Sequence, residues 1–254
     1  ERIKQIIPET ADDRRLARVS WGFRRSQIRR AFVETADESL IGEFEKGFME
    51  AVESNDFRYS WAKSLSEMDL RIYTNEQDRL LDIALTPIEP GEGAWGPMAF
   101  SLLRTLAIEL SLNRANLDQA RLVAEEILEH EEVIMSETTS RCSCLPASLA
   151  RAYTVVGNTE EAQRWAGKLL EERGAGSDWT IYALMYLDLD RSVELAFEEL
   201  ARSGDSRLLD EIAAYYVWNR VFLAHPKVQA YYLDEGKWID YLAARVPEYA
   251  KYRQ

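Results

Sequence analysis

The stretch LARAYTVVGNTEEAQRWAGKLLEE, residues 149–172, constrains the fold more than any other part of the sequence. It is typical of two short amphipathic helices joined by a tight turn, because Gly157 favours a helix end and Thr159 favours a helix start. The predicted apolar faces consist of Leu149, Ala150 and Tyr153 on the first helix, and of Ala162, Trp165, Ala166 and Leu169 on the second. Two such short helices need neighbours to bury these faces, which favours an array of helical pairs.

Small side chains occupy fixed positions in this helical pair. Ala150 and Ala162 fall where two antiparallel helices with so short a connection would cross, and a larger side chain would force the helices apart. The pattern Ala-x-x-Tyr-x-x-x-Gly-x-x-x-x-Ala resembles the tetratricopeptide repeat. It departs from that repeat at Ala166, where an aromatic residue is usual, and it lacks the closing proline. The resemblance implies an all-α, right-handed α-solenoid of antiparallel helix pairs.

Two looser copies of the pattern flank the first one, at residues 102–129 and 181–204. The matching positions are Ala107, Leu110, Ala120 and Ala124 upstream, and Ala183, Tyr186, Ser192 and Ala196 downstream. The segments NRAN and DLD are the expected turns, and residues 130–143 are an expected linker. After the third copy, HPKVQAYYLDEG resembles the closing element of tetratricopeptide domains in bacterial regulators and cyclases, with His225 and Val228 replacing its aspartate and phenylalanine.

Composition agrees with an all-α chain. Strong helix formers are abundant, and the 254 residues contain only 12 glycines and 7 prolines. Helices are predicted near residues 12–33, 37–54, 57–73 and 75–85. The proline- and glycine-rich segment 86–97 is the expected boundary loop. We therefore expect a helical N-terminal region or cap over residues 1–85, and a repeat region with C-terminal capping helices over residues 98–254.

Charge is distributed unevenly along the chain. The net charge is −13, which argues against nucleic acid as a partner for the bulk of the chain. Residues 1–33, however, hold nine basic and four acidic residues, giving +5 and leaving −18 for the remainder. The predicted basic surface consists of Arg14, Arg15, Arg18, Arg24, Arg25, Arg29 and Arg30. This segment is expected to dock on the chain's own acidic part, or to bind an anionic partner or a second copy.

Few residues suggest catalysis or metal binding. Cys142 and Cys144, two positions apart, would point in different directions on a helix or a strand, so a disulfide between them is not expected. Glu126 and His130 share a helix face but lack further ligands, and His225 is expected to cap or pack. The sequence predicts no metal, no cofactor and no catalytic residues. No run is apolar enough to span a membrane.

A concave helical-repeat groove is the expected functional surface. Its predicted lining, from the first helix of each pair, is Arg104, Glu109, Arg151, Thr154, Tyr182 and Met185. The leading hypothesis is a non-enzymatic domain that binds a protein or peptide, within a larger bacterial scaffold or sensor. The alternatives are a polymer-acting hydrolase on a helical scaffold and an oligomeric structural protein. Because the chain begins at Glu1, we expect it to be processed or cut from a longer protein, in the cytoplasm or periplasm.

Overall fold

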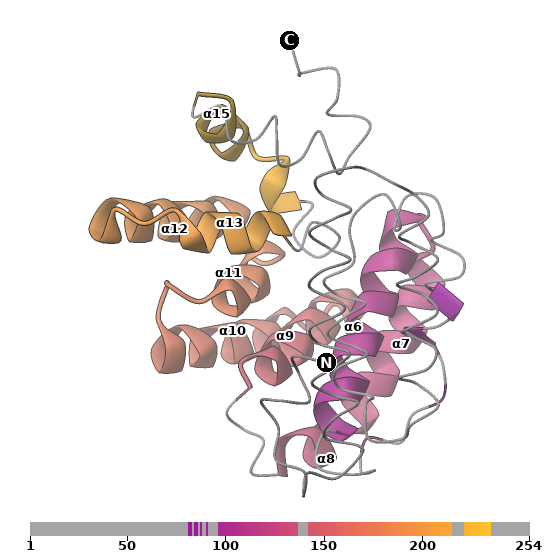
Figure 1. The fold of residues 1–254 in the computed structure, drawn as a ribbon. Coiled ribbons are helices and arrows are strands. Elements are labelled where there is room, and N and C mark those ends of the chain that lie inside the picture. The colour runs from indigo at the N-terminus through magenta and orange to yellow at the C-terminus, as the bar shows by residue number, and fades with distance from the viewer. Residues whose placement is uncertain are drawn as a thin grey trace, which may run out of the picture. The chain divides into compact units, whose positions relative to one another are not determined.

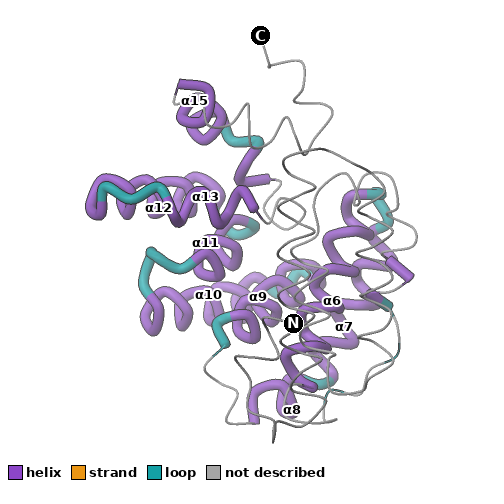
Figure 2. The backbone as a smooth tube through the Cα atoms, viewed as in Figure 1, coloured by secondary structure: helices purple, strands orange, loops and turns teal. Residues whose placement is uncertain are grey.

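The computed structural model describes residues 81–82, 84–85, 87, 90, 96–136, 142–214 and 221–234. The chain divides into two compact units, Glu1–Trp61 and Ala62–Gln254, and the described residues all belong to the second unit. These residues form helices and connecting turns, without a strand among them (Figure 2). The predicted all-α class is confirmed for this part of the chain. The helices predicted at 12–33, 37–54 and 57–73 lie outside the described residues.

Three successive helix pairs correspond to the three sequence copies (Figure 1). The pairs are α6 (Gly96–Asn113) with α7 (Leu117–Glu129), α9 (Cys144–Val156) with α10 (Thr159–Arg173), and α11 (Asp178–Met185) with α12 (Leu189–Ser203). A short helix, α8 (Glu131–Ser136), lies between the first and second pairs, and α13 (Arg207–Ala214) and α15 (Pro226–Asp234) follow the third. The helices expected in the three sequence copies are thus present, and the two helices of each pair pack on each other.

The turn between α9 and α10 shows how local sequence sets the helix ends. Gly157 ends α9 with φ of 84°, a left-handed conformation that glycine adopts without steric cost. The N-cap of α10 is Asn158, whose side chain accepts a hydrogen bond from the Glu161 N–H at 3.3 Å. The prediction of Thr159 as the cap was wrong by one residue, because the preceding asparagine is an equally strong capping type.

Three other predicted boundaries also shift. Helix α6 begins at Gly96, inside the predicted loop 86–97, because Pro97 suits the first helical turn, where no backbone N–H is required. Part of the predicted linker forms α8, which buries Ile134 completely. The predicted DLD turn, residues 188–190, ends two residues earlier, at Asp188, because the Asp188 side chain caps α12 through the Arg191 N–H at 3.0 Å.

Packing among the described helices follows chain order. The first helices of successive pairs pack against each other, α6 on α9 and α9 on α11. The second helices fill the spaces between them, with α7 also packed on α9 and α10 also packed on α11. Helix α13 continues this order by packing on both α11 and α12 (Figure 1).

Helix α6 is buried along nearly its whole length. Every residue from Gly96 to Ser111 is buried, and these residues are largely apolar around the whole helix. The alanines of the repeat pattern are also inaccessible: Ala107, Ala150 and Ala162 have no exposed surface. Small residues therefore lie in the core, as the repeat pattern predicted.

Helix α15, which follows the third pair, contacts the preceding helix α13. His225 caps this helix, since its Nδ1 accepts the Lys227 N–H at 3.2 Å, which confirms the expected capping role. Val228 is fully buried. The Tyr232 hydroxyl donates to the Leu209 carbonyl of α13 at 2.6 Å, which joins α15 to the preceding helices. No helix in the described part of the chain is long and apolar enough to cross a bilayer.

Candidate functional site

A buried polar network connects the first helices of the three pairs. Glu109 on α6 forms an ion pair with Arg151 on α9, with Nε to Oε1 at 2.5 Å and Nη2 to Oε2 at 3.3 Å. The hydroxyls of Tyr182 on α11 and of Tyr186, the C-cap residue of α11, each donate to a Glu109 oxygen at 2.9 Å. The Arg151 guanidinium also lies over the Tyr186 ring, 3.2 Å from its centroid. One carboxylate therefore bridges three helices that are distant in the sequence.

Burial makes this network energetically demanding. Glu109, Arg151 and Tyr182 are only 3%, 5% and 2% exposed. Burial alone would lower the pKa of Arg151, but the negative charge of Glu109 reverses this and raises the pKa above its ordinary value. Burial, and then the charge of Glu109, raise the pKa of Tyr182 well above its ordinary value. The guanidinium therefore stays charged and the Tyr182 phenol stays protonated at neutral pH.

Three of the six predicted groove residues, Glu109, Arg151 and Tyr182, meet in this network. Thr154 is half-buried, and its hydroxyl donates to the Ala150 carbonyl of its own helix at 2.8 Å. Met185 is buried. The sequence analysis placed these residues on an accessible trough, whereas five of the six are buried and the polar ones are paired. Their part in partner binding stays a prediction.

Arg104 has surroundings of its own, apart from the network. Its Nη1 donates to the Ala84 carbonyl at 2.7 Å, and its Nε lies 2.8 Å from a carboxylate oxygen of Glu126 on α7. Its guanidinium also lies 5.2 Å from the centroid of the Phe100 ring. Arg104 thus links α6 to α7 and to the segment before α6, at a different place from Glu109.

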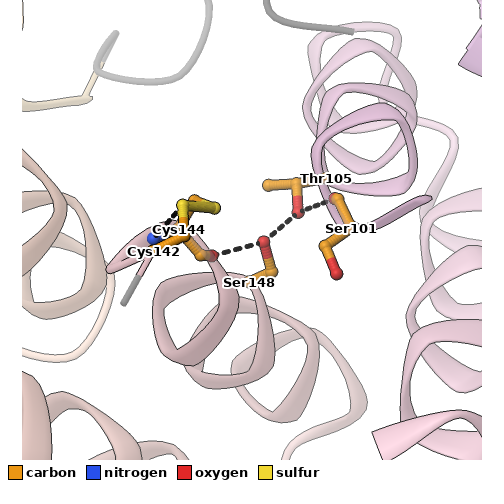
Figure 3. The surroundings of a disulfide bond; sticks show 5 residues. All are labelled: Ser101, Thr105, Cys142, Cys144 and Ser148. Carbon is orange, nitrogen blue, oxygen red and sulfur yellow. Dashed lines mark hydrogen bonds between the residues drawn. A yellow bond between two sulfur atoms is a disulfide. The ribbon is translucent and has the colours of Figure 1, made fainter. Parts of the chain in front are cut away.

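A second polar contact joins α6 and α9 near the start of α9. The Thr105 hydroxyl donates to the Ser148 hydroxyl at 2.9 Å, and Ser148 donates to the Cys144 carbonyl at 2.8 Å (Figure 3). Thr105 and Ser148 are 43 residues apart, the same separation as between the pattern alanines Ala107 and Ala150. Equivalent positions of the first and second copies therefore lie opposite each other.

Cys142 and Cys144 form a disulfide, which corrects the expectation from the sequence (Figure 3). That expectation assumed that both residues share one helix or one strand. Instead Cys142 precedes the helix and Cys144 is the first residue of α9. Their Cα atoms are 5.2 Å apart, within the range that a disulfide spans. A turn begins at Cys142, whose carbonyl accepts the Leu145 N–H at 3.2 Å, and it leads directly into α9.

The residues considered as metal ligands have other partners. Glu126 pairs with Arg104, and the His130 ring packs edge-on against Phe100. His225 Nε2 lies 3.2 Å from an oxygen of Asp190, on α12. Among the described residues, no group of three or more histidine, cysteine, aspartate or glutamate side chains is placed to hold a metal ion. The predicted basic surface of Arg14 to Arg30 lies outside those residues.

Sequence reasoning missed the role of Tyr186 in the network, although a usable signal was present. Tyr182 and Tyr186 are four residues apart, which places both rings on one face of α11. Each oxygen of Glu109 accepts two contacts, one from Arg151 and one from a tyrosine, so this carboxylate is held by its neighbours. The arrangement is suited to fixing helices in place rather than to transferring protons.

Comparison with protein-family models, with curated proteins and with solved structures finds no match for this chain. Its function is therefore inferred from the repeat pattern and from the geometry of the described helices.

Proposed function

We propose that the chain is a non-enzymatic interaction domain of the tetratricopeptide-like kind. It stacks antiparallel helix pairs into an α-solenoid and binds a protein or peptide along the inner, concave side. Within a longer bacterial protein it acts as the scaffold or sensor part. This proposal extends a fold-level analogy to function, so its weight comes from how the helices pack.

The order of helix contacts is the main support. In a stack of helix pairs, each first helix packs on the first helix of the next pair, and each second helix fills the gap between them. The contacts of α6 with α9 and of α9 with α11 fit the first rule, and those of α7 with α9 and of α10 with α11 fit the second. The 43-residue offset between Thr105 and Ser148 agrees with a repeat in register.

The Glu109 network supports a curved arrangement. Helices α6 and α11 belong to pairs separated by a whole intervening pair, yet one side chain of α6 reaches two tyrosines of α11. Such contact requires the first helices to converge on the side where Glu109 lies. We therefore propose that the Glu109 network lies on the inner, concave side of the solenoid.

The accessible residues next to the network are the proposed contact points. Thr154 and Tyr186 are half-buried and lie at the C-terminal ends of α9 and α11. Tyr186 supplies a rigid aromatic surface, a type of residue that often anchors binding interfaces. A peptide or a partner helix that packs over these two ends is the class of ligand that the proposal requires.

Selection from a displayed peptide library, followed by calorimetry on the selected peptides, tests this proposal. We expect Thr154→Arg to weaken the binding of a selected peptide by about tenfold or more, which corresponds to about 1.4 kcal/mol. The matched control is Gln163→Arg, which places the same side chain on an exposed position of the second helix α10 and should leave the affinity unchanged.

Both variants must first show the circular dichroism spectrum and melting temperature of the parent chain. Equal weakening by the two variants, or no effect of either, would place the contact away from the ends of α9 and α11. A library that yields no binder at all would remove the support for peptide recognition.

A further inference from the structure

The Cys142–Cys144 disulfide lies at the start of α9 and closes a very short segment of chain, unlike a typical structural cross-link. The two cysteines are separated by only two positions. A cross-link restricts the unfolded chain more when it closes a longer loop, so one that closes so short a segment contributes least to global stability. Its effect is confined to the beginning of α9, which calls for another reason for its presence.

The sulfur of Cys142 performs a capping task at this helix start. Helices α7, α10 and α12 begin with a side-chain oxygen that accepts a backbone N–H, at Asn116, Asn158 and Asp188, whereas the N-cap residue of α11, Ser177, makes no such bond. Helix α9 lacks such a bond from its N-cap residue, Ser143. Instead the Cys144 N–H donates to the Cys142 sulfur at 3.3 Å. A thiolate at Cys142 could accept the same N–H, and with more strength because it carries a full negative charge.

The two sulfurs differ in accessibility. Cys142 is half-buried, whereas Cys144 is only 1% exposed. An incoming thiol therefore reaches Cys142 and not Cys144. Cys144 opens a helix of 13 residues, whose N-terminal end favours negative charge and so favours a departing thiolate. Rapid thiol–disulfide exchange requires that one sulfur is accessible and that the other is stabilised as a leaving group. Cys142 meets the first condition and Cys144 meets the second.

We infer that Cys142 and Cys144 form a redox-active pair that exchanges electrons with a dithiol reductant. A thiolate of the reductant attacks the Cys142 sulfur, which breaks the Cys142–Cys144 bond and releases the Cys144 thiolate. The second thiol of the reductant then attacks the reductant sulfur that is bound to Cys142, and the Cys142 thiolate is released. The reductant loses two electrons and becomes a cyclic disulfide, and its two protons pass to the two cysteines.

The position of the pair links its redox state to the packing of α6 on α9. Cys144 lies one helical turn before Ser148, which donates to the Cys144 carbonyl and accepts from Thr105 on α6 (Figure 3). Opening the disulfide frees Cys142 from Cys144 and loosens the first turn of α9. The contact between Ser148 and Thr105 is the nearest link from that turn to a neighbouring helix, so its geometry responds first.

The test equilibrates the full native chain with mixtures of reduced and oxidised dithiothreitol, and then traps free thiols with a maleimide that shifts the mass. We expect both cysteines to become labelled together in one two-electron transition, while the helical circular dichroism signal is retained. Thiols that appear only after the chain is unfolded in guanidinium would overturn the inference. So would two free thiols that persist when the reduced chain is transferred into an excess of oxidised glutathione.

Single-cysteine variants separate exchange from a purely structural cross-link. With Cys144→Ser, the remaining Cys142 should form a mixed disulfide with oxidised glutathione at least about tenfold faster than Cys144 does in Cys142→Ser, because Cys142 is accessible to glutathione and Cys144 is buried. Both variants are compared in the folded state, which is checked by circular dichroism. Equal rates for the two variants would contradict the proposed order of attack.

Discussion

At the scale of single residues, burial decides which polar side chains matter. Glu109 and Arg151 are both buried and pair with each other, so each compensates the loss of hydration of the other. Tyr182 and Tyr186 satisfy the remaining acceptor sites of Glu109. Arg191 on α12, by contrast, pairs with Glu194 on the exposed surface, where water competes for both charges.

Removing one member of the buried pair should therefore be costly. We expect Arg151→Met to lower the free energy of unfolding by about 3–5 kcal/mol, because it leaves the Glu109 carboxylate buried without a cation. The double variant Glu109→Leu with Arg151→Met should be more stable than Arg151→Met alone, since no unpaired charge remains. Urea unfolding followed by circular dichroism measures both values.

The matched control for this experiment is Arg191→Met, which removes an exposed arginine. Its unfolding transition should coincide with that of the parent chain. If Arg151→Met proved no more damaging than this control, the network would have no structural role.

At the scale of elements, short local signals set where each helix begins and ends. Gly157 ends α9 in the left-handed region of backbone conformation, whereas Gly167 lies within α10 at ordinary helical geometry. A Cβ atom added at either position would have no neighbouring atom within 4 Å. The two glycines therefore differ in backbone conformation and not in available space.

The same substitution at these two positions should have opposite effects. Gly157→Ala should destabilise the protein by about 1 kcal/mol, because a left-handed conformation disfavours a side chain. Gly167→Ala should stabilise it by about 0.5–1 kcal/mol, because alanine is the better helix former. Thermal unfolding of the two variants beside the parent chain measures whether each one is more or less stable. A Gly157→Ala variant that is more stable than the parent would contradict the assigned helix end.

At the scale of the whole described array, small residues permit close approach of the helices. Ala150 on α9 and Ala162 on α10 have no exposed surface, and these two helices pack directly on each other. The apolar surface of α6 is enclosed on all sides. Close packing of this kind leaves little volume for an added side chain.

Enlarging the pattern alanines should accordingly disturb the array. We expect Ala150→Leu and Ala162→Leu each to lower the free energy of unfolding by about 1–3 kcal/mol, the usual cost of overpacking a core. Ala201→Leu, on the exposed face of α12, is the control and should change stability by less than about 0.5 kcal/mol. Denaturant titration of the three variants measures their free energies of unfolding. If leucine at both pattern positions left the stability unchanged, the close packing inferred here would be refuted.

The sequence by itself determined the helical class, the three pairs from α6 to α12, the turn at Gly157 and the burial of Ala107, Ala150 and Ala162. These features depend on local propensity and on a periodicity of 3.6 residues, both of which are legible within a few turns of chain. The cap at Asn158 lay within one residue of the expected Thr159, because two capping types occur side by side there.

Only the tertiary structure decided the partners of the polar residues. Glu109 meets Arg151 across 42 residues and Tyr182 across 73, so no local pattern contains the information that they touch. The disulfide depended on where α9 begins, because it joins a residue outside the helix to the first residue inside it. Periodicity identifies which face of a helix is buried, whereas the identity of the residue on the opposing face is set by the packing of the whole chain.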